Sequence, residues 1–72
     1  MLDSASPAEL RYDTPDYEML RPGRYVLCAV SGERIALDEL KYWSAAHQEA
    51  YHGAAEATAA MLAGGARNLA RR

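Results

Sequence analysis

The chain has 72 residues, which is enough for one small hydrophobic core and too few for two domains. Its formal net charge of −2 argues against a general nucleic-acid binder, because such proteins usually carry a basic excess. A single cysteine excludes an intramolecular disulfide, and no run resembles a secretory signal or a membrane span, so we expect a cytoplasmic protein that makes no membrane contact.

Composition divides the chain into three parts. Residues 1–7 mix small, polar and proline residues without a period, which predicts a flexible arm. Residues 8–63 are expected to form a single α+β domain, and residues 64–72 a basic tail. The arginines of that tail are Arg67, Arg71 and Arg72.

Alternating apolar residues and turn chemistry predict several short antiparallel strands before the helix. The turn Arg21-Pro22-Gly23-Arg24 fits type II, in which proline presets φ and glycine accepts a positive φ, and it should join two antiparallel strands. Residues 25–30 are almost wholly apolar, so we expect a central strand covered on both faces. Strands are expected at 17–20, 25–30 and 34–37, with turns at Asp13–Asp16 and Ser31–Glu33. Residues 8–12 are compatible with a short edge strand, and residues 40–43 also alternate as a strand does.

One long alanine-rich helix is expected after the strands. Ser44 is a good N-cap for residues 45–62, Gly53 marks a weak point inside the helix, and Gly64-Gly65 should end it. The predicted fold is α+β, with three to four short antiparallel strands followed by one C-terminal helix. Small residues in the second half of the helix would let a second copy approach and form a homodimer, although a surface helix of high propensity is the favoured interpretation.

Cys28 is the first candidate for a nucleophile, because a thiolate can attack an electrophile or bind a metal. Its place in an apolar strand argues otherwise, because burial raises the pKa of a thiol and makes it inert. No paired carboxylates, phosphate-binding glycine loop or nucleophile elbow accompany it. We therefore expect no enzymatic activity and no catalytic residue.

The spacing around Cys28 is similar to that of a zinc ribbon or treble clef. Cys28-Ala29-Val30-Ser31-Gly32 matches a zinc knuckle on a hairpin, and Ser44-Ala45-Ala46-His47 repeats the spacing at the expected start of the helix. Only Cys28 and His47 are competent ligands, because serine does not replace a thiolate for zinc. The sequence therefore predicts a metal-free version of this fold, without metal or cofactor.

Aromatic residues with a polar tip are enriched at protein interfaces, and several collect around the expected start of the helix. Tyr42 and Trp43 are neighbours in a strand, so one should anchor the core while the other is more exposed. Trp43 as a core residue is the alternative to a binding role. The candidates for partner binding are Tyr42, Trp43, Gln48 and Tyr51.

These observations predict a non-catalytic interaction module that docks a protein partner or a second copy of itself. The alternative is a degenerate zinc-ribbon-like protein that contacts nucleic acid through Arg21, Arg24, Arg34 and the basic tail. Salt should weaken that second kind of binding steeply.

Several short runs resemble one bacterial family. They lie between Leu10 and about Ala55, and they include Leu20-Arg21-Pro22-Gly23, Cys28-Ala29-Val30-Ser31-Gly32, Tyr42-Trp43 and Gln48-Glu49-Ala50-Tyr51. On these runs the chain resembles the domain of unknown function 2093 family of short, chiefly alphaproteobacterial proteins. The resemblance implies a compact cytoplasmic protein and assigns no catalytic or binding residue. It also implies arginine where this chain has His47.

Overall fold

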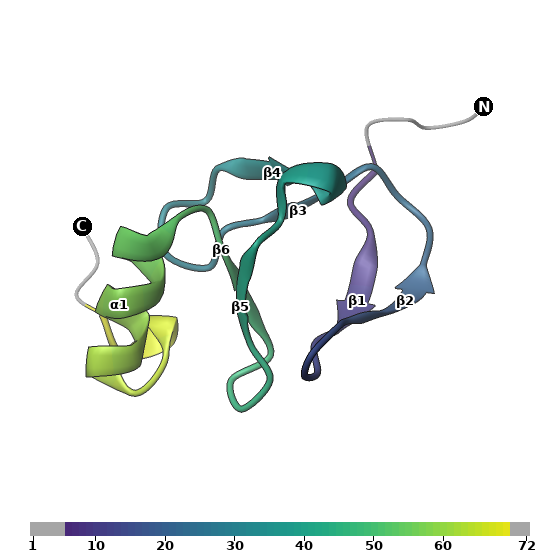
Figure 1. Ribbon diagram of the computed structural model, residues 1–72. Helices are drawn as coiled ribbons and strands as arrows, with labels where there is room; N and C mark the ends of the chain where they lie inside the picture. The colour runs from purple at the N-terminus through teal and green to yellow at the C-terminus, as the bar shows by residue number, and fades with distance from the viewer. Residues whose placement is uncertain (1–5, 70–72) are drawn as a thin grey trace.

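In the computed structural model, which describes residues 6–69, six short strands precede one α-helix (Figure 1). The predicted α+β class, with short antiparallel strands and one C-terminal helix, is confirmed, although the strands number six rather than three or four. The strands are β1 (Glu9–Arg11), β2 (Glu18–Arg21), β3 (Tyr25–Leu27), β4 (Arg34–Ala36), β5 (Tyr42–Ser44) and β6 (Glu49–Tyr51). Helix α1 (Ala54–Ala63) follows them, and the 3₁₀ turns η1 (Leu37–Glu39) and η2 (Ala66–Asn68) complete the described chain.

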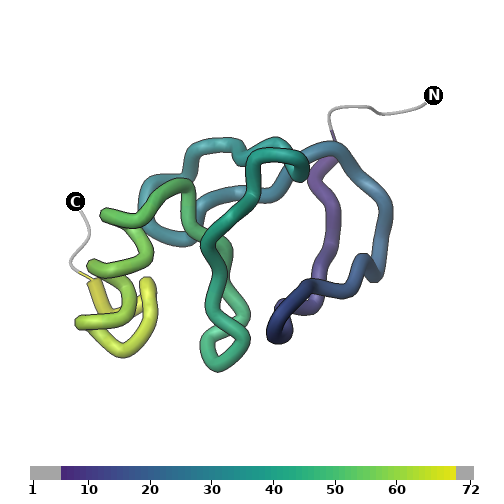
Figure 2. Tube along the Cα trace, in the orientation of Figure 1, coloured from purple at the N-terminus to yellow at the C-terminus, as the bar shows by residue number. Residues whose placement is uncertain are grey.

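The strands form three separate two-stranded antiparallel ribbons: β1–β2, β3–β4 and β5–β6. Figure 2 shows the first and third ribbons extending from the same side of the second, and α1 beyond the third ribbon, far from β1–β2. An isolated two-stranded ribbon is marginally stable in water. The fold therefore depends on side chains that pack between the ribbons.

The β5–β6 ribbon lies between two hydrophobic clusters. In its register Trp43 pairs with Ala50 and Tyr42 with Tyr51, and side chains of paired residues share a face. Ala50 belongs to the larger cluster, against which Trp43 packs, whereas Tyr51 faces the helix in the smaller cluster. The larger cluster is Val26, Cys28, Ile35, Leu40 and Ala50, and the smaller is Tyr51, Ala60 and Ala66.

The chain turns between β3 and β4 as predicted, and Gly32 supplies a positive φ of 79°, although the turn lies at residues 29–31 rather than at Ser31–Glu33. The strand before it is shorter than predicted, because β3 ends at Leu27. Leu27 is 52% exposed, so this strand is buried on one face only. The prediction of a central strand covered on both faces was wrong.

The turn at Arg21–Arg24 does not join paired strands, because β2 pairs with β1 and β3 with β4. Gly23 lacks the positive φ of a type II turn. Gly23 has no side chain, which lets its backbone pass close to the backbone of Pro7 and Ala8. A Cβ at this position would collide with the amide nitrogen of Ala8. That amide donates to the carbonyl oxygen of Tyr25 at 2.7 Å, and Pro7 forms a bridge with Tyr25. Residues 6 and 7 of the predicted arm thus lie along β3.

The predicted start of the helix was wrong by nine residues. The Ser44 hydroxyl accepts a hydrogen bond from the His47 amide at 3.0 Å, as an N-cap would, but the chain turns back into β6 because Gln48 adopts a left-handed φ of 54°. The helix begins at Ala54, and Gly53 is its N-cap rather than an interior residue. Its predicted end is confirmed, since Gly64 is the C-cap with a φ of 79°.

The first residues of the predicted basic tail fold back onto the body. Gly65 donates its amide to the carbonyl of Ala60 at 2.8 Å, and Ala66 is buried. Arg71 and Arg72 lie outside the described residues.

We expect Gly23→Ala to lower the free energy of unfolding by about 2 kcal/mol or more, because the new methyl group would collide with backbone atoms. Gly53→Ala is the matched control. Gly53 is extended, and the nearest atom to a new Cβ is the flexible Glu56 Oε1 at 3.1 Å, so its cost should stay below about 1 kcal/mol. Urea unfolding measures both, and equal losses would contradict the close contact at Ala8.

Candidate functional site

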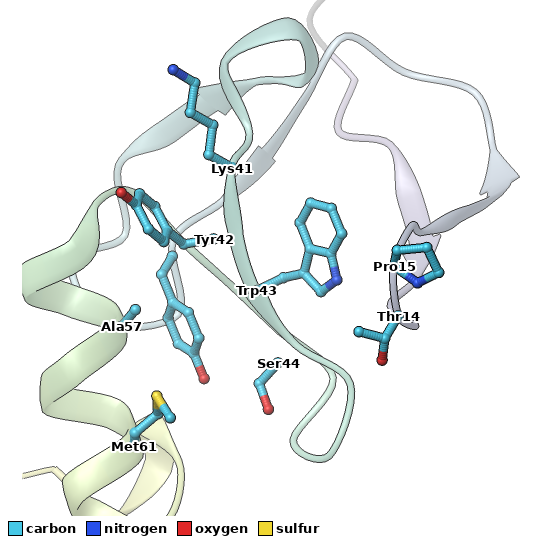
Figure 3. Close-up of a pocket in the computed structure, with 9 residues that line it drawn as sticks. Thr14, Pro15, Lys41, Tyr42, Trp43, Ser44, Ala57 and Met61 are labelled. Carbon is cyan, nitrogen blue, oxygen red and sulfur yellow. The ribbon is translucent and has the colours of Figure 1, made fainter.

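A groove of about 350 Å³ follows β5 between helix α1 and the tip of the β1–β2 ribbon. Figure 3 shows Tyr42, Ala57 and Met61 on one side of β5, and Thr14 and Pro15 on the side that Trp43 faces. Ser44 and Tyr51 complete its lining, together with Lys41. Three of the four predicted partner-binding residues, Tyr42, Trp43 and Tyr51, therefore share one groove.

The groove passes around the open edge of β5. Neighbouring residues of a strand face opposite ways, so a cavity lined by both Tyr42 and Trp43 must pass an edge of the strand. Strand β6 covers one edge, and in residues 6–69 no strand pairs with the other. The backbone of β5 is therefore part of the groove.

The backbone groups of Trp43 point into this open edge. The carbonyl of Ala50 accepts a hydrogen bond from the Ala29 amide at 2.9 Å, on the side of β6 that faces away from β5. Trp43 and Ala50 are thus a non-hydrogen-bonded pair of the ladder, and the N–H and C=O of Trp43 point away from β6. No other backbone group in residues 6–69 bonds to them.

The Trp43 side chain links β5 to the tip of the β1–β2 ribbon on one side of the groove. Its indole Nε1 donates to the carbonyl of Asp13 at 2.8 Å, and its ring meets Tyr17 edge-on at 5.4 Å between centroids. Trp43 also packs against the larger cluster, so it is chiefly an anchor between ribbons. Its neighbour Tyr42 is 42% exposed, as the alternation of a strand predicts.

Helix α1 contributes an exposed apolar wall that the sequence did not reveal. Met61 is 69% exposed and lies over the groove, whereas its neighbour Leu62, 85% exposed, does not line it. Lys41 is the one charged side chain among the described lining residues, and it has no ion pair within residues 6–69. The groove is thus apolar with one cation at its end.

Gln48 is placed outside the groove and joins two ribbons. Its Oε1 accepts from the Tyr12 amide at 2.9 Å, and its Nε2 donates to the Tyr12 carbonyl at 2.7 Å. Nε2 also donates to the Ala45 carbonyl at 2.8 Å. The Gln48 side chain thereby bonds to both backbone groups of Tyr12, as a neighbouring strand would, and holds the β1–β2 tip beside the β5–β6 turn.

A second internal polar contact holds η2 to β6. Glu49 Oε1 accepts from the Tyr51 hydroxyl at 2.7 Å and from the Ala66 amide at 3.0 Å. The pKa of Tyr51 is raised to about 12, and burial is the largest cause of this rise. The hydrogen bond to the Glu49 carboxylate and the negative charge of that carboxylate also contribute to it. The Tyr51 ring lines the groove, but its hydroxyl has a structural role.

Cys28 lies in a knuckle-like turn. It is 3% exposed, and its Sγ accepts from the amides of Val30 at 3.4 Å and Ser31 at 3.3 Å. The expectation of a raised thiol pKa was wrong: burial does raise the pKa of Cys28, but hydrogen bonds from Ser31, His52 and Val30 lower it by more. In residues 6–69 no three His, Cys, Asp or Glu side chains are grouped to hold a metal.

His47, the other competent ligand in the zinc-ribbon-like spacing, lies against Gly65, where an added Cβ would sit 3.3 Å from the His47 Nδ1. His47 belongs to the turn between β5 and β6, not to a helix start, so the second half of that spacing is built on a different element. The likeness to a zinc ribbon remains a prediction.

The profile of a protein family described as "uncharacterized protein conserved in bacteria (DUF2093)" matches residues 19–60, more than half of the chain. The chain belongs to this family. The matched DUF2093 segment runs from β2 into α1, so it contains β5 and most of the groove. No curated protein and no solved structure matches the chain. Within residues 6–69, no helix is long and apolar enough to cross a membrane.

We expect the stability of the protein to fall between about pH 10 and pH 12 because of Tyr51. Its phenol ionises near pH 10 in an unfolded chain and at about 12 in the fold, so the fold favours the neutral form. This stabilisation is complete below about pH 10 and is lost as the pH rises through 12. Tyr51→Phe should cost about 1 kcal/mol at pH 7 and make the alkaline decline shallower.

Urea unfolding from pH 8 to 12 measures this difference. Tyr42→Phe is the control, because Tyr42 is exposed and should leave the decline as it is. A decline in Tyr51→Phe as steep as that of the natural sequence would disprove the role of the Glu49 contact.

Proposed function

We propose that the protein is a non-catalytic module that docks a protein partner in the groove along β5. One observation supports this most strongly: exposed apolar side chains and an unpaired strand edge occur together at Trp43, Tyr42 and Met61. Apolar surface beside unpaired backbone groups is typical of sites that bind polypeptide. A partner can bury the apolar surface and form hydrogen bonds with the backbone groups.

The chemistry of the groove supports a binding role rather than a catalytic one. Among the described lining residues, none is a histidine, a cysteine or a carboxylate, so the hydroxyls of Thr14 and Ser44 have no imidazole or carboxylate base in the groove to activate them. The thiol of Cys28 is buried outside the groove and shielded by the turn that follows it. A free buried thiol also suits the reducing cytoplasm, where we propose that the protein acts.

Protein docking is favoured over nucleic-acid contact because two of the candidate arginines have partners on the surface of the chain. Arg21 lies 3.7 Å from a carboxylate oxygen of Glu9, and the Arg34 guanidinium stacks 4.6 Å from the centre of the Tyr25 ring. The groove itself offers one cation, Lys41, and nucleic-acid sites normally combine several.

The test uses two neighbouring residues of α1. Met61→Asp places a carboxylate inside the groove, whereas Leu62→Asp places the same charge just beside it. Tagged protein with each change is cross-linked in cells of the source bacterium, and the bound polypeptides are quantified. We expect one set of proteins to be retained with Leu62→Asp and to fall about tenfold with Met61→Asp, because a desolvated carboxylate costs more than 1 kcal/mol.

Circular dichroism should show that both variants keep the fold, since both side chains are exposed. Equal recovery of bound protein by the two variants would contradict the proposal. Bound material that disappears after nuclease treatment and falls steeply with salt would favour the nucleic-acid alternative instead.

A further inference from the structure

Building on the proposed function, we infer that the docked segment is an extended strand of another protein, which pairs with the open edge of β5 and carries a carboxylate toward Lys41. The inference names the conformation and the charge of the ligand. Three features of the groove support it: the backbone of Trp43, the two walls and the lone cation.

The backbone of Trp43 selects an extended ligand. Its N–H and C=O point away from β6 into the groove, where one residue of an added strand can bond to both. A docked helix has its backbone groups paired internally and would leave both Trp43 groups without a partner. Covering them without pairing would cost about 1–3 kcal/mol for each group, so the groove favours a strand over a helix.

The two walls of the groove match the alternating side chains of a strand. An added strand would lie about 4.8 Å from β5 and send its residues alternately to the two faces of the ribbon. One face meets Tyr42 and Met61, which are exposed and apolar enough to take a large aliphatic side chain. The other face meets Pro15 beside the Trp43 ring, as Figure 3 shows.

The charge in the groove selects an acidic ligand. Lys41 lies at the end of the groove away from Ser44 and Met61 (Figure 3). It is the one charged side chain among the described lining residues, and no carboxylate within residues 6–69 pairs with it. A carboxylate at that end of the docked strand would find a cation at the edge of an apolar surface, where ion pairing is stronger than in open water.

A second copy of this chain fits the groove less well than a foreign segment. The strand best placed to donate itself is β2, which is exposed at all four residues and unpaired on its outer edge within residues 6–69. Pairing of β2 with the β5 edge of another copy would join two different surfaces. Unless both strands pair reciprocally, such a head-to-tail contact builds rings or open chains of molecules rather than a simple pair.

The test begins with a displayed library of random ten-residue peptides. The library is selected on the full chain and depleted on Met61→Asp, so that the surviving peptides bind in the groove. Synthetic copies of the selected peptides are then measured by fluorescence anisotropy. We expect sequences with alternating large aliphatic residues and an Asp or Glu near one end.

A scan with single N-methyl groups distinguishes pairing from side-chain docking. Methylation of the one peptide amide that faces Trp43 should weaken binding about tenfold, the value of one hydrogen bond, while methylation of either neighbouring amide should change it less than about twofold. Tolerance at every position would overturn the strand inference, and so would losses at several consecutive positions, which indicate a helix.

A charge exchange tests the carboxylate. Lys41→Glu should weaken the selected peptides about tenfold and should prefer copies in which the acidic residue is replaced by lysine. The control is Arg24→Glu, which changes charge outside the groove and should leave affinity unchanged. Unchanged affinity with Lys41→Glu would overturn the acidic part of the inference.

The outcomes separate this inference from the proposed function. If no peptide binds the natural chain more tightly than Met61→Asp, the groove is not a docking site and the proposed function fails. If peptides bind there but tolerate every N-methyl group, the proposed function stands and the strand inference falls. Association of the protein with itself that a selected peptide disperses would assign the groove to a second copy and overturn the foreign ligand.

Discussion

The β5–β6 ribbon holds the fold together by packing between two hydrophobic clusters. The Trp43–Ala50 pair faces the larger cluster, and Tyr51 faces the helix. Both clusters are small, and a short chain buries a smaller fraction of its surface than a large domain does. A ribbon covered on both faces joins them into one unit. The same arrangement leaves the outer edge of β5 unpaired, since residues 6–69 contain no third strand for it.

The features that local chemistry decides could be predicted from the sequence. The turn at Gly32, the helix end at Gly64 and the opposite facing of Tyr42 and Trp43 all follow from φ preferences or from the period of a strand. The start of the helix could not be predicted. Ser44 caps a turn in either case, and the residues after it have good helix propensity. This propensity is overridden by contacts between residues far apart in the sequence. The main one joins the side-chain carboxamide of Gln48 to the backbone N–H and C=O of Tyr12.

The candidate site was predicted in part, for the same reason. Aromatic character pointed to Tyr42, Trp43 and Tyr51, which line one groove, but Gln48 is engaged by backbone groups elsewhere. Met61 was not among the predicted binding residues, because its place in the groove depends on where α1 packs. The signal that could have found the groove is a two-stranded ribbon with an uncovered edge, and that required the second strand, β6, to be recognised. The prediction for the pKa of Cys28 was wrong for a similar reason. The sequence predicts that the thiol is buried, but it does not predict that backbone amides donate hydrogen bonds to the sulfur.

Membership of the DUF2093 family locates β5 within the shared segment and leaves the function to be argued from the groove. Docking of a strand requires that the N–H and C=O of Trp43 be unpaired in the isolated protein. Amide hydrogen exchange followed by NMR tests it most directly. The amides of Tyr42 and Ser44, which face β6, should exchange slowly, whereas the Trp43 amide should exchange at least about tenfold faster. Equal protection of all three amides would show that the Trp43 amide is already hydrogen-bonded, which would contradict the docking of a strand at the outer edge of β5.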